Sequence, residues 1–471
     1  MIASQVVKEL KDVVGDRFAS VDSEITYLYH YDFITAEPEG KCDLAIMPNS
    51  AEEVQKIVQI ANKHKIPIIP WVSGINFGGV GNPYKGGIVM DLRRMNRILE
   101  VNEDDMYALI EAGVTWADLK GYLQKNHPDL RPGVTWSPPG TGVVPSCLCY
   151  GMFDMGNLGG SGAEFVNGMQ VVLGTGELVK FGSCSASNQW YGRMPFPDLS
   201  GLLIGADGTV GCVTKMSVKL WPMMPYRRDY VAITQKMDVG VPVMNKLARI
   251  GIGINDIILV NHGWLQSTVG DNEKNMPIDP LKANPPIPDF YGSIKIQAYT
   301  EKQHEAQCEA LESICKEKGL MIMPASERET PVQVWGCWNF ARGGGGEWIG
   351  SYCSTKDIVD YYNISREICI KYNRPPQFYS RIMFGGHYSV ARTNLNFNKN
   401  DPKDIETARK ALKEIYTEVH KIDGVAMYKT PRWANKSHEE RMLPATSNLI
   451  KKIKKLLDPN NIFNPGRIGV D

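Results

Sequence analysis

Apolar residues recur at helical spacing in the stretch AEEVQKIVQIANKH, where positions 54, 57, 58 and 61 are hydrophobic. This spacing predicts an amphipathic helix over residues 51–64. Ser50 precedes the helix and Glu53 follows three residues later, which is the pattern of a capping box. Short apolar runs on either side predict strands at 45–47, 67–70 and 88–92. A further helix and an extended arm are expected before residue 40.

The next block alternates apolar and polar positions with a period of two. The segment GMQVVLGTGELVKFG predicts two strands that are joined by a hairpin at Gly174-Thr175-Gly176. Residues 201–222 again predict strands and turns, and a strand at 108–112 and a helix at 116–125 come before them. Strands outnumber helices here, which favours an α+β domain over a doubly wound sheet.

The pattern changes near Pro222, where longer helices begin to alternate with β segments. Helices are predicted at 301–319 and 401–423, and the proline-rich stretch 278–290 predicts an exposed loop. From Glu439 onward a basic amphipathic helix leads into LDPNNIFNPGRIGVD. We therefore expect an α+β domain, a second domain and a C-terminal segment, at residues 1–222, 223–440 and 441–471.

Length, charge and hydropathy exclude several classes of protein. A chain of 471 residues is too long for a single ordinary core. Lys and Arg number 52, as do Asp and Glu, so nucleic acid is not an expected partner. Apolar runs fall short of the ~20 residues that span a bilayer, and the N-terminus lacks the apolar core of a signal peptide. We expect a cytoplasmic protein without a membrane span.

The ten cysteines are scattered and form no C-x-x-C pair. In a chain of this length the spacing does not indicate a disulfide framework or a zinc or iron–sulfur site, so buried thiols are expected. The eight histidines are isolated, with no HxH or HExxH. No metal is predicted.

Two glycine-rich stretches lie where chemistry could occur, PWVSGINFGGVGNPYKGG at 70–87 and a second at 138–164. The Walker pattern is absent, and the first loop leads to a strand rather than a helix, which disfavours a Rossmann dinucleotide site. Backbone N–H groups in such loops can still form an anion-binding concavity, because glycine permits close approach and positive φ. The loops predict either a two-sided diphosphate site or a pair of ordinary turns.

The pattern P-x-V-x-G-x-N-x-G and the following IVMDLRRMNRILEV resemble the FAD-binding domain of the vanillyl-alcohol oxidase/p-cresol methylhydroxylase (PCMH) superfamily. The similarity continues through GMQVVLGTGELVKFG and GLLIGADGTVGCVTKMSVKLWPMMP, and so covers residues 42–225. FARGGGGEWIG, AMYKTPRW and the C-terminal LDPNNIFNPGRIGVD are similar to the 4-alkylphenol-oxidising branch. The resemblance implies a PCMH-type FAD-binding domain and a cap domain with an antiparallel sheet.

The resemblance also implies which residues hold FAD. The two glycine loops would contact the diphosphate, a later segment would run past the adenine or ribityl part, and the tail would approach the flavin. The residues implied are Trp71, Val72, Ser73, Gly74, Ile75, Asn76, Phe77, Gly78, Gly79, Pro139, Gly140, Thr141, Gly142, Gly156, Asn157, Gly160, Ser161, Gly211, Val213, Asn464 and Arg467. Arg467 is a cation that could stabilise the anionic reduced flavin.

The branch implies hydride transfer to flavin N5 from a small hydroxylated substrate of the 4-hydroxybenzylic or 4-alkylphenol kind. Tyr428 and Lys429 match the segment that anchors the phenolate, and His387 and Arg381 lie near the segment that carries the flavin-linking histidine, whose own position falls at Val390 or Ala391. The cap pocket is expected to be aromatic, with Trp335, Trp338, Trp348, Tyr379 and Trp433.

Two positions depart from the family pattern. Gly79 stands where a tyrosine completes the phenolate site, and Pro139 or Gly140 stands where an acidic residue approaches N5. Two alternatives therefore stay open: an FAD-dependent D-2-hydroxyacid dehydrogenase of the lactate or glycolate type, and a non-catalytic FAD-fold subunit. We also expect an electron acceptor, such as an electron-transfer protein or an iron–sulfur subunit, and a homo-oligomer or redox complex.

Overall fold

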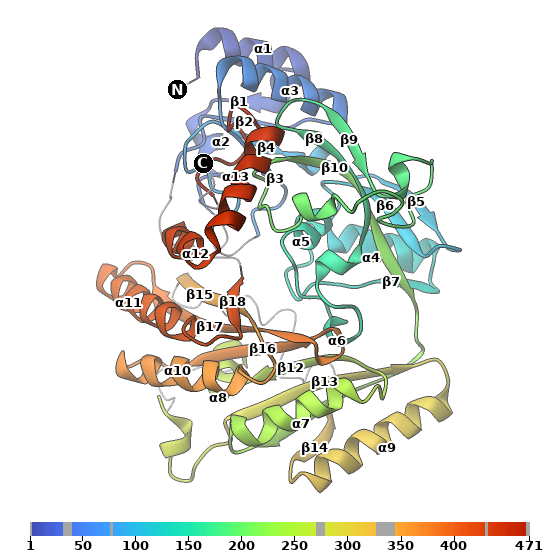
Figure 1. The fold of residues 1–471 in the computed structure, drawn as a ribbon, viewed down its shortest axis with the longest axis vertical. Coiled ribbons are helices and arrows are strands. Elements are labelled where there is room, and N and C mark those ends of the chain that lie inside the picture. The colour runs from blue at the N-terminus through green and yellow to red at the C-terminus, as the bar shows by residue number, and fades with distance from the viewer. Residues whose placement is uncertain are drawn as a thin grey trace.

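The computed structural model describes residues 2–31, 40–75, 79–269, 278–325, 344–428 and 432–467. The chain forms two bodies, an upper one that contains both termini and a lower one built around a large sheet (Figure 1). The sheets of the upper body run between Ala19 and Pro222, and the lower sheet runs between Tyr226 and Tyr428. The α+β prediction is confirmed.

The first sheet of the upper body has the order β1-β2-β4-β3. Its three longer strands are parallel, and β1 pairs with β2 in the antiparallel sense. The elements of this layer are α1 (Ser4–Val14), β1 (Ala19–Ser20), α2 (Ser23–Tyr27), β2 (Leu44–Ile46), α3 (Ala51–His64), β3 (Ile68–Trp71) and β4 (Ile88–Asp91).

Helix α3 has the bounds that its apolar spacing predicts, but its N-terminus differs from a full capping box. Ser50 Oγ accepts from the N–H of Glu53 at 3.2 Å, as expected. The Glu53 carboxylate instead accepts from the N–H of Asn49, at 2.7 Å. The Glu53 carboxylate therefore binds one residue further upstream than the sequence pattern predicts.

The second sheet of the upper body is antiparallel, with the order β5-β6-β10-β8-β9 and β7 paired to β10. The predicted hairpin joins β8 to β9. The elements are β5 (Ile98–Asn102), β6 (Tyr107–Glu111), α4 (Trp116–Asn126), β7 (Leu130–Pro132), α5 (Val143–Leu148), α6 (Gly156–Gly159), β8 (Val166–Leu173), β9 (Leu178–Phe181) and β10 (Gly211–Pro222).

The lower body, called the cap here, is built on an eight-stranded antiparallel sheet of order β14-β11-β13-β12-β16-β17-β15-β18. Its elements are β11 (Tyr226–Thr234), α7 (Met237–Arg249), β12 (Ile254–Val260), α8 (His262–Val269), β13 (Phe290–Ala298), α9 (Glu301–Glu317), β14 (Met321–Ala325), β15 (Gly344–Cys353), α10 (Ile358–Lys371), β16 (Gln377–Met383), β17 (Tyr388–Asn398), α11 (Pro402–Val419) and β18 (Val425–Tyr428).

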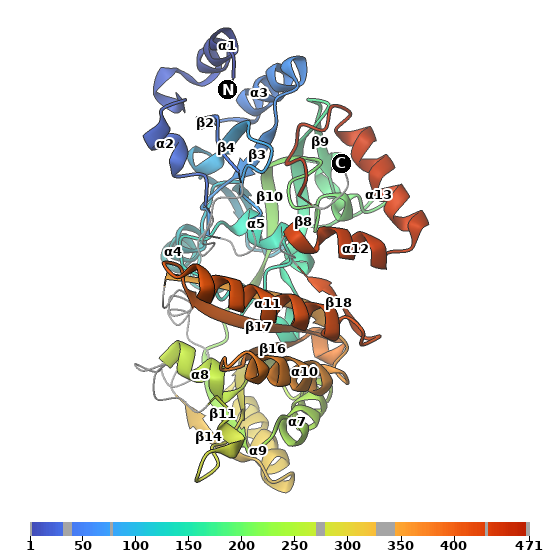
Figure 2. The ribbon, with the colours of Figure 1, turned by 90° about the vertical axis from the view of Figure 1, so that its left-hand side faces the viewer.

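Helices cover one face of the cap sheet, and α10 and α11 lie in front of β16 and β17 in Figure 2. The largest hydrophobic core lies between this face and helices α7, α9, α10 and α11. Residues at alternate positions on β15 point to the two faces of the sheet. Ile349 and Cys353 belong to the core under the helices, whereas Trp348 packs with Met152 of the upper body. The other face of the cap sheet is therefore turned toward the upper body.

After β18 the chain returns to the upper body through α12 (Asn435–Arg441) and α13 (Pro444–Leu457). The tail that follows extends the first sheet, because Phe463 forms a parallel bridge with Ile68 of β3. The backbone N–H of Ile68 donates to the carbonyl of Ile462 at 2.6 Å, and the N–H of Asn464 donates to the carbonyl of Ile68 at 2.8 Å. The last described residues are thus fixed beside the strand that leads into the first glycine loop.

Candidate functional site

The first glycine loop folds against the indole ring of Trp71, the last residue of β3. A Cβ atom on Gly74 would lie 2.6 Å from the ring, and one on Gly81 would lie 3.0 Å from it. Gly74 also has φ +65, so both space and backbone conformation require glycine there.

The indole itself is held from its other sides. The Tyr29 ring packs edge-on with a centroid distance of 5.0 Å, and the Arg93 guanidinium lies 4.8 Å from the indole centroid. Asp91 connects these two groups, because it accepts from Tyr29 Oη at 2.8 Å and from Arg93 Nη2 at 2.6 Å. Burial and the charge of Asp91 raise the pKa of Tyr29, so its hydroxyl remains a donor.

The second glycine segment lies directly against the first. A Cβ atom on Gly142 would come within 2.8 Å of both the Val72 and Pro145 side chains. Gly142 forms an isolated bridge with Thr115, and the Ser146 hydroxyl donates to the Gly142 carbonyl at 2.7 Å. The sequence predicts that these loops share a site, and the structure places them in contact.

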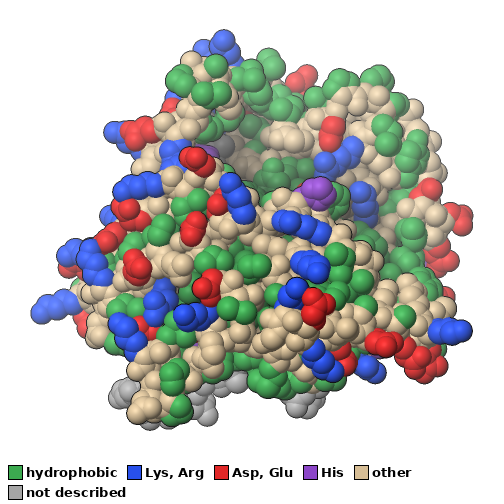
Figure 3. Space-filling view, turned by 60° about the horizontal axis from the view of Figure 1, so that its bottom comes forward, with side chains coloured by type: hydrophobic (Ala, Val, Ile, Leu, Met, Phe, Trp, Pro, Cys, Tyr) green, Lys and Arg blue, Asp and Glu red, His purple; other side chains and the backbone are tan. Residues whose placement is uncertain are grey.

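A cavity of about 1010 Å³, its open mouth included, lies between the two loops and reaches the cap. It is lined by Tyr31, Pro70, Trp71, Val72, Ser73, Gly74, Ile75, Val80, Gly81, Asn82, Thr135, Trp136, Ser137, Thr141, Pro145, Ser146, Cys149, Gly151, Met152 and Arg392. With the cap brought forward, the molecular surface is hollowed near the upper edge of Figure 3, where hydrophobic side chains gather. The cap contributes a cation to this lining, Arg392.

The register of the cap sheet explains how Arg392 reaches the cavity. Residues directly opposite each other on antiparallel strands share a face. Arg392 lies opposite Tyr379 on one side and Gly350 on the other, and Gly350 lies opposite Tyr428. Tyr379 packs in parallel with the Trp136 ring of the upper body, at a centroid distance of 5.9 Å. This row of the sheet therefore lies on the face turned toward the upper body.

Aromatic rings surround the guanidinium of Arg392. It lies 4.5 Å from the ring centroid of Trp348 and 5.9 Å from that of Tyr379. Stacking of this kind is attractive because the ring face is negative, and it orients the planar guanidinium. An oriented cation at the wall of an aromatic cavity can bind the anionic end of a small ligand.

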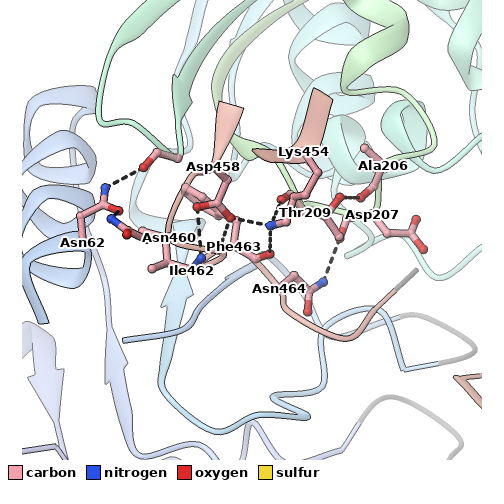
Figure 4. Close-up of polar contacts among 11 residues, drawn as sticks. Asn62, Ala206, Asp207, Thr209, Lys454, Asp458, Asn460, Ile462, Phe463 and Asn464 are labelled. Carbon is pink, nitrogen blue, oxygen red and sulfur yellow. Dashed lines mark hydrogen bonds and ion pairs between the residues drawn. The ribbon is translucent and has the colours of Figure 1, made fainter. Parts of the chain in front are cut away.

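The tail binds the first glycine loop and the turn at Asp207, and Figure 4 shows the contact between Asn464 and Asp207. Asn464 Nδ2 donates to the carbonyl of Val80 in the first glycine loop, at 3.0 Å, and to the carbonyl of Asp207, at 2.8 Å. Arg467 is 1% exposed, and its Nε donates to the Asp207 carboxylate at 3.1 Å. Both predicted tail residues thus lie at the glycine loop and at the turn that contains Asp207.

Lys454 of α13 fixes the tail in place. This lysine is buried, and its Nζ donates to the carbonyls of Thr209, at 2.6 Å, and Phe463, at 3.0 Å. It also pairs with Asp458, whose carboxylate accepts from the N–H groups of Ile462 and Phe463 (Figure 4). The sequence pattern did not single out Lys454, because a lysine in a basic amphipathic helix is typically solvated.

Apart from the two tail residues, the predicted FAD-contacting residues are divided between the cavity lining, positions beside it and positions away from it. The cavity lining includes Trp71, Val72, Ser73, Gly74, Ile75 and Thr141. Beside the lining, in the same two loops, lie Gly79, Pro139, Gly140 and Gly142. Residues Asn76, Phe77 and Gly78 lie outside the described residues.

The remaining predicted contacts lie away from the lining. Helix α6 faces the cap: a Cβ on Gly156 would meet Arg381, and Asn157 Nδ2 donates to the carbonyl of Ile254 at 2.9 Å. Gly160 and Ser161 follow α6, where the Ser161 hydroxyl donates to Glu164. Gly211 and Val213 are buried in β10.

Several lining residues were missed by the sequence prediction, among them Asn82, Trp136, Ser146 and Cys149. Asn82 lies in the first glycine-rich stretch, so the glycine pattern could have identified it. The others depend on how α5 and its flanking turns fold back, for which no local pattern exists.

The predicted catalytic residues are also dispersed. Arg381 is 1% exposed and pairs with the equally buried Asp256 at 2.7 Å. His387 is exposed at the start of β17, Tyr428 ends β18 opposite Gly350, and Lys429 lies outside the described residues. Of the arginines in this segment, Arg392 is the one that lines the cavity.

The aromatic residues that were predicted to line the cap pocket also lie in different places. Trp348 and Tyr379 lie beside Arg392, whereas Trp335 and Trp338 lie outside the described residues. The prediction for Trp433 is wrong. Its ring packs on Tyr416 of α11, at a centroid distance of 5.5 Å, and so belongs to the helix-covered side of the sheet.

Within the described ranges, no three His, Cys, Asp or Glu side chains are grouped to bind a metal ion. The nine cysteines that the structure describes are all buried, as predicted for structural thiols. None of the helices between residues 2 and 467 that the structure describes is long and apolar enough to cross a membrane.

Comparison with known proteins identifies both bodies. Residues 42–182 match the family model "FAD binding domain", and residues 234–468 match "FAD linked oxidases, C-terminal domain". The flavoprotein subunit of 4-cresol dehydrogenase [hydroxylating] from Pseudomonas putida is 24% identical over 99% of this chain and 96% of its own length. The mitochondrial D-lactate dehydrogenase [cytochrome] of Arabidopsis thaliana is 23% identical over 99% of this chain and 80% of its own.

A solved structure of p-cresol methylhydroxylase with bound substrate superimposes with a TM-score of 0.86 at 21% identity. It covers 99% of this chain and 96% of that one, and shows the shared fold.

The residues present fit FAD. The two loops that meet at the cavity contain Gly74, Gly81 and Gly142, where a Cβ would lie 3.0 Å or less from a neighbouring side chain, so the main chain can approach a ligand closely there. Asn82 contributes a buried amide to the lining, and neither of its polar atoms has a hydrogen-bond partner among the described residues. The chain is therefore an FAD-dependent enzyme, and it belongs to the FAD-linked oxidases of the vanillyl-alcohol oxidase/p-cresol methylhydroxylase superfamily.

Proposed function

We propose that the protein oxidises a small hydroxylated aromatic substrate, of the 4-hydroxybenzylic or 4-alkylphenol kind, that binds as an anion against Arg392. The observation that carries the proposal is the position of this guanidinium, which lines the cavity and stacks on Trp348 and Tyr379. A phenolate needs a cation at its oxygen and apolar surface beside its ring, and these residues offer both.

The strand β15 shapes the space next to Arg392. On the face turned to the upper body it presents Trp348, Gly350 and Tyr352 at alternate positions. Gly350 lies directly opposite Arg392, about 5 Å away across the strands, and has no side chain to fill the space between the two flanking rings. A flat ring fits such a gap, with its anionic end toward Arg392.

The chain's own groups would bind and orient the substrate. The guanidinium is always charged, so it favours the ionised phenol and withdraws no proton itself. The aromatic walls exclude water from the reacting carbon, which strengthens the ion pair. FAD, when bound, would supply the acceptor for the hydride, which carries the two electrons of the oxidised C–H bond.

The electrons must then leave the protein, and we infer that a separate electron-transfer partner takes them. The Pseudomonas relative is described as a flavoprotein subunit, which supports an assembly of this kind. Reoxidation of the substrate-reduced protein by ferricyanide or cytochrome c, compared with oxygen, tests the inference. Rapid reoxidation by oxygen alone would contradict it.

A second candidate is an FAD-dependent D-2-hydroxyacid dehydrogenase, because a guanidinium fork binds a carboxylate as well as a phenolate. Named relatives include a D-lactate dehydrogenase of similar identity. The aromatic surroundings of Arg392 favour the ring-bearing substrate. The third possibility, a non-catalytic subunit, loses its support, since both family models and the named relatives are those of enzymes.

Anaerobic titration of the purified flavoprotein decides between the two candidates. We expect 4-hydroxybenzyl alcohol or a 4-alkylphenol to bleach the flavin absorbance, and D-lactate, glycolate and D-2-hydroxyglutarate to leave it unchanged. The opposite result would assign the hydroxyacid activity. Benzyl alcohol without the phenolic hydroxyl is the matched control for the role of the anion.

A further inference from the structure

Asn82, at the end of the first glycine loop, is buried without a hydrogen-bond partner among the described residues. It is 1% exposed and lines the cavity, and neither its Oδ1 nor its Nδ2 has a hydrogen-bond partner among the described residues. Buried amides in folded proteins are nearly always paired, because an unpaired one loses its hydration without compensation. The arrangement indicates a partner that is part of the bound state.

Hydrogen bonds on either side fix the backbone at Asn82. Its own N–H donates to the carbonyl of Gly79 at 3.1 Å, and its carbonyl accepts from the N–H of Tyr84 at 3.0 Å. Two residues earlier, the carbonyl of Val80 accepts from Asn464 of the tail. The main chain at Asn82 is thus ordered before any ligand arrives, which reduces the entropy lost on binding.

We propose that the Asn82 side chain makes a paired donor and acceptor contact with FAD. An amide has N–H groups to donate and a carbonyl to accept, and both are unpaired here. The diphosphate of FAD offers acceptors only. The isoalloxazine edge, the ribityl hydroxyls and the adenine edge offer both kinds of group, so Asn82 contacts one of these and is a cofactor-binding residue.

Asn82→Leu tests the contact, because leucine has the same branched shape and no polar atom. We expect less flavin per chain in the purified protein, and an FAD dissociation constant raised about 10- to 100-fold on titration of the FAD-free protein. The melting temperature of the FAD-free protein should stay the same or rise, since the substitution removes an unpaired buried amide. Unchanged FAD affinity would overturn the proposal, as would a lower melting temperature of the FAD-free protein.

Asn82→Asp separates the proposed partner from the diphosphate. A carboxylate facing the diphosphate would be repelled and would weaken FAD far more than leucine does. We expect aspartate to be no worse than leucine, and a much larger loss would overturn the assignment. Asn245→Leu is the matched control, because Asn245 is a buried cap residue whose Nδ2 donates to the carbonyl of Thr355 at 2.8 Å. It should lower the melting temperature and leave FAD affinity unchanged.

Discussion

The guanidinium of Arg392 lies 4.5 Å from the ring centroid of Trp348, on the face of the cap sheet that meets the FAD-binding body. If this pair holds the substrate anion, Arg392→Met should lower kcat/KM by about 100- to 1000-fold, in line with the loss of a charge-assisted hydrogen bond in a desolvated site. Arg392→Lys should recover part of the loss, because lysine keeps the charge without the fork.

Stopped-flow reduction of the flavin under anaerobic conditions measures this prediction directly. Arg409→Met is the matched control, because Arg409 of α11 pairs with Glu347 of β15 at 2.8 Å. It should leave the reduction rate unchanged. Equal rates in the Arg392→Met and Arg409→Met proteins would contradict a substrate role for Arg392.

Gly350 should determine how large a substrate the site accepts. Gly350→Val places a branched side chain between Trp348 and Tyr352, opposite Arg392, and so fills the proposed gap. We expect KM to rise at least tenfold and the rise to grow with the size of the 4-substituent, while flavin content stays unchanged. Gly121→Ala, where an added Cβ meets no atom within 4 Å, is the control. A uniform fall in activity for all substrates would argue against a gap.

Arg381, which the sequence predicts to be catalytic, forms a buried ion pair with Asp256 at 2.7 Å. Both side chains are fully buried, and Arg381 also contacts α6 at Gly156. Arg381→Met should destabilise the protein by about 3–5 kcal/mol, because it leaves a buried carboxylate unpaired. The double variant Arg381→Met/Asp256→Leu should recover most of this loss. A double variant that is stable but has no substrate reduction would support the catalytic role instead.

Lys454 should control whether the tail holds the cofactor. Lys454→Met removes the cation that pairs with Asp458 and the donor to Thr209 and Phe463. The tail then loses the anchor that keeps Asn464 on the glycine loop, so we expect faster flavin release and cleavage of the tail by protease. Lys452→Met, at an exposed position of the same helix, should have neither effect.

The parts of the fold that were predictable are those specified by nearby residues. The apolar spacing of residues 51–64 sets the bounds of α3, and the glycine turn at 174–176 sets the hairpin between β8 and β9. The capping of α3 already shows the limit. Glu53 accepts from Asn49 rather than Ser50, and the pattern alone does not distinguish between the two N–H groups.

The candidate site was predictable on its cofactor side and less so on its substrate side. The first loop carries its own signature, because two of its glycines, Gly74 and Gly81, lie against one neighbouring ring, Trp71. Arg392 and Arg381 lie on the same face of the cap sheet. Arg392 pairs with Tyr379, and Arg381 pairs with Val390 two positions away along β16 and β17. Long-range packing decides that one lines the cavity and the other pairs with Asp256, and no local spacing encodes that choice.

Asp289 gives the cap a pH dependence that can be measured. It is 1% exposed, and burial raises its pKa from 3.8 to about 6, although Tyr362 Oη and the N–H of His262 donate to the carboxylate and Arg366 lies nearby. Asp279, which pairs with Arg366, raises the pKa further. Between the two pKa values the folded state therefore binds more protons than the unfolded state.

The sign of the effect follows from this proton difference. Stability falls as pH rises through the window from about 4 to about 6, by up to about 3 kcal/mol, because the folded state must then hold a charged carboxylate in a buried site. Asp289→Asn cannot titrate, so its denaturation midpoint should vary less over this window than that of the unmodified protein. Asp104→Asn, at an exposed position between β5 and β6, should keep the original slope. Identical slopes in all three proteins would mean that Asp289 remains ionised throughout, with its charge stabilised by Tyr362 and Arg366.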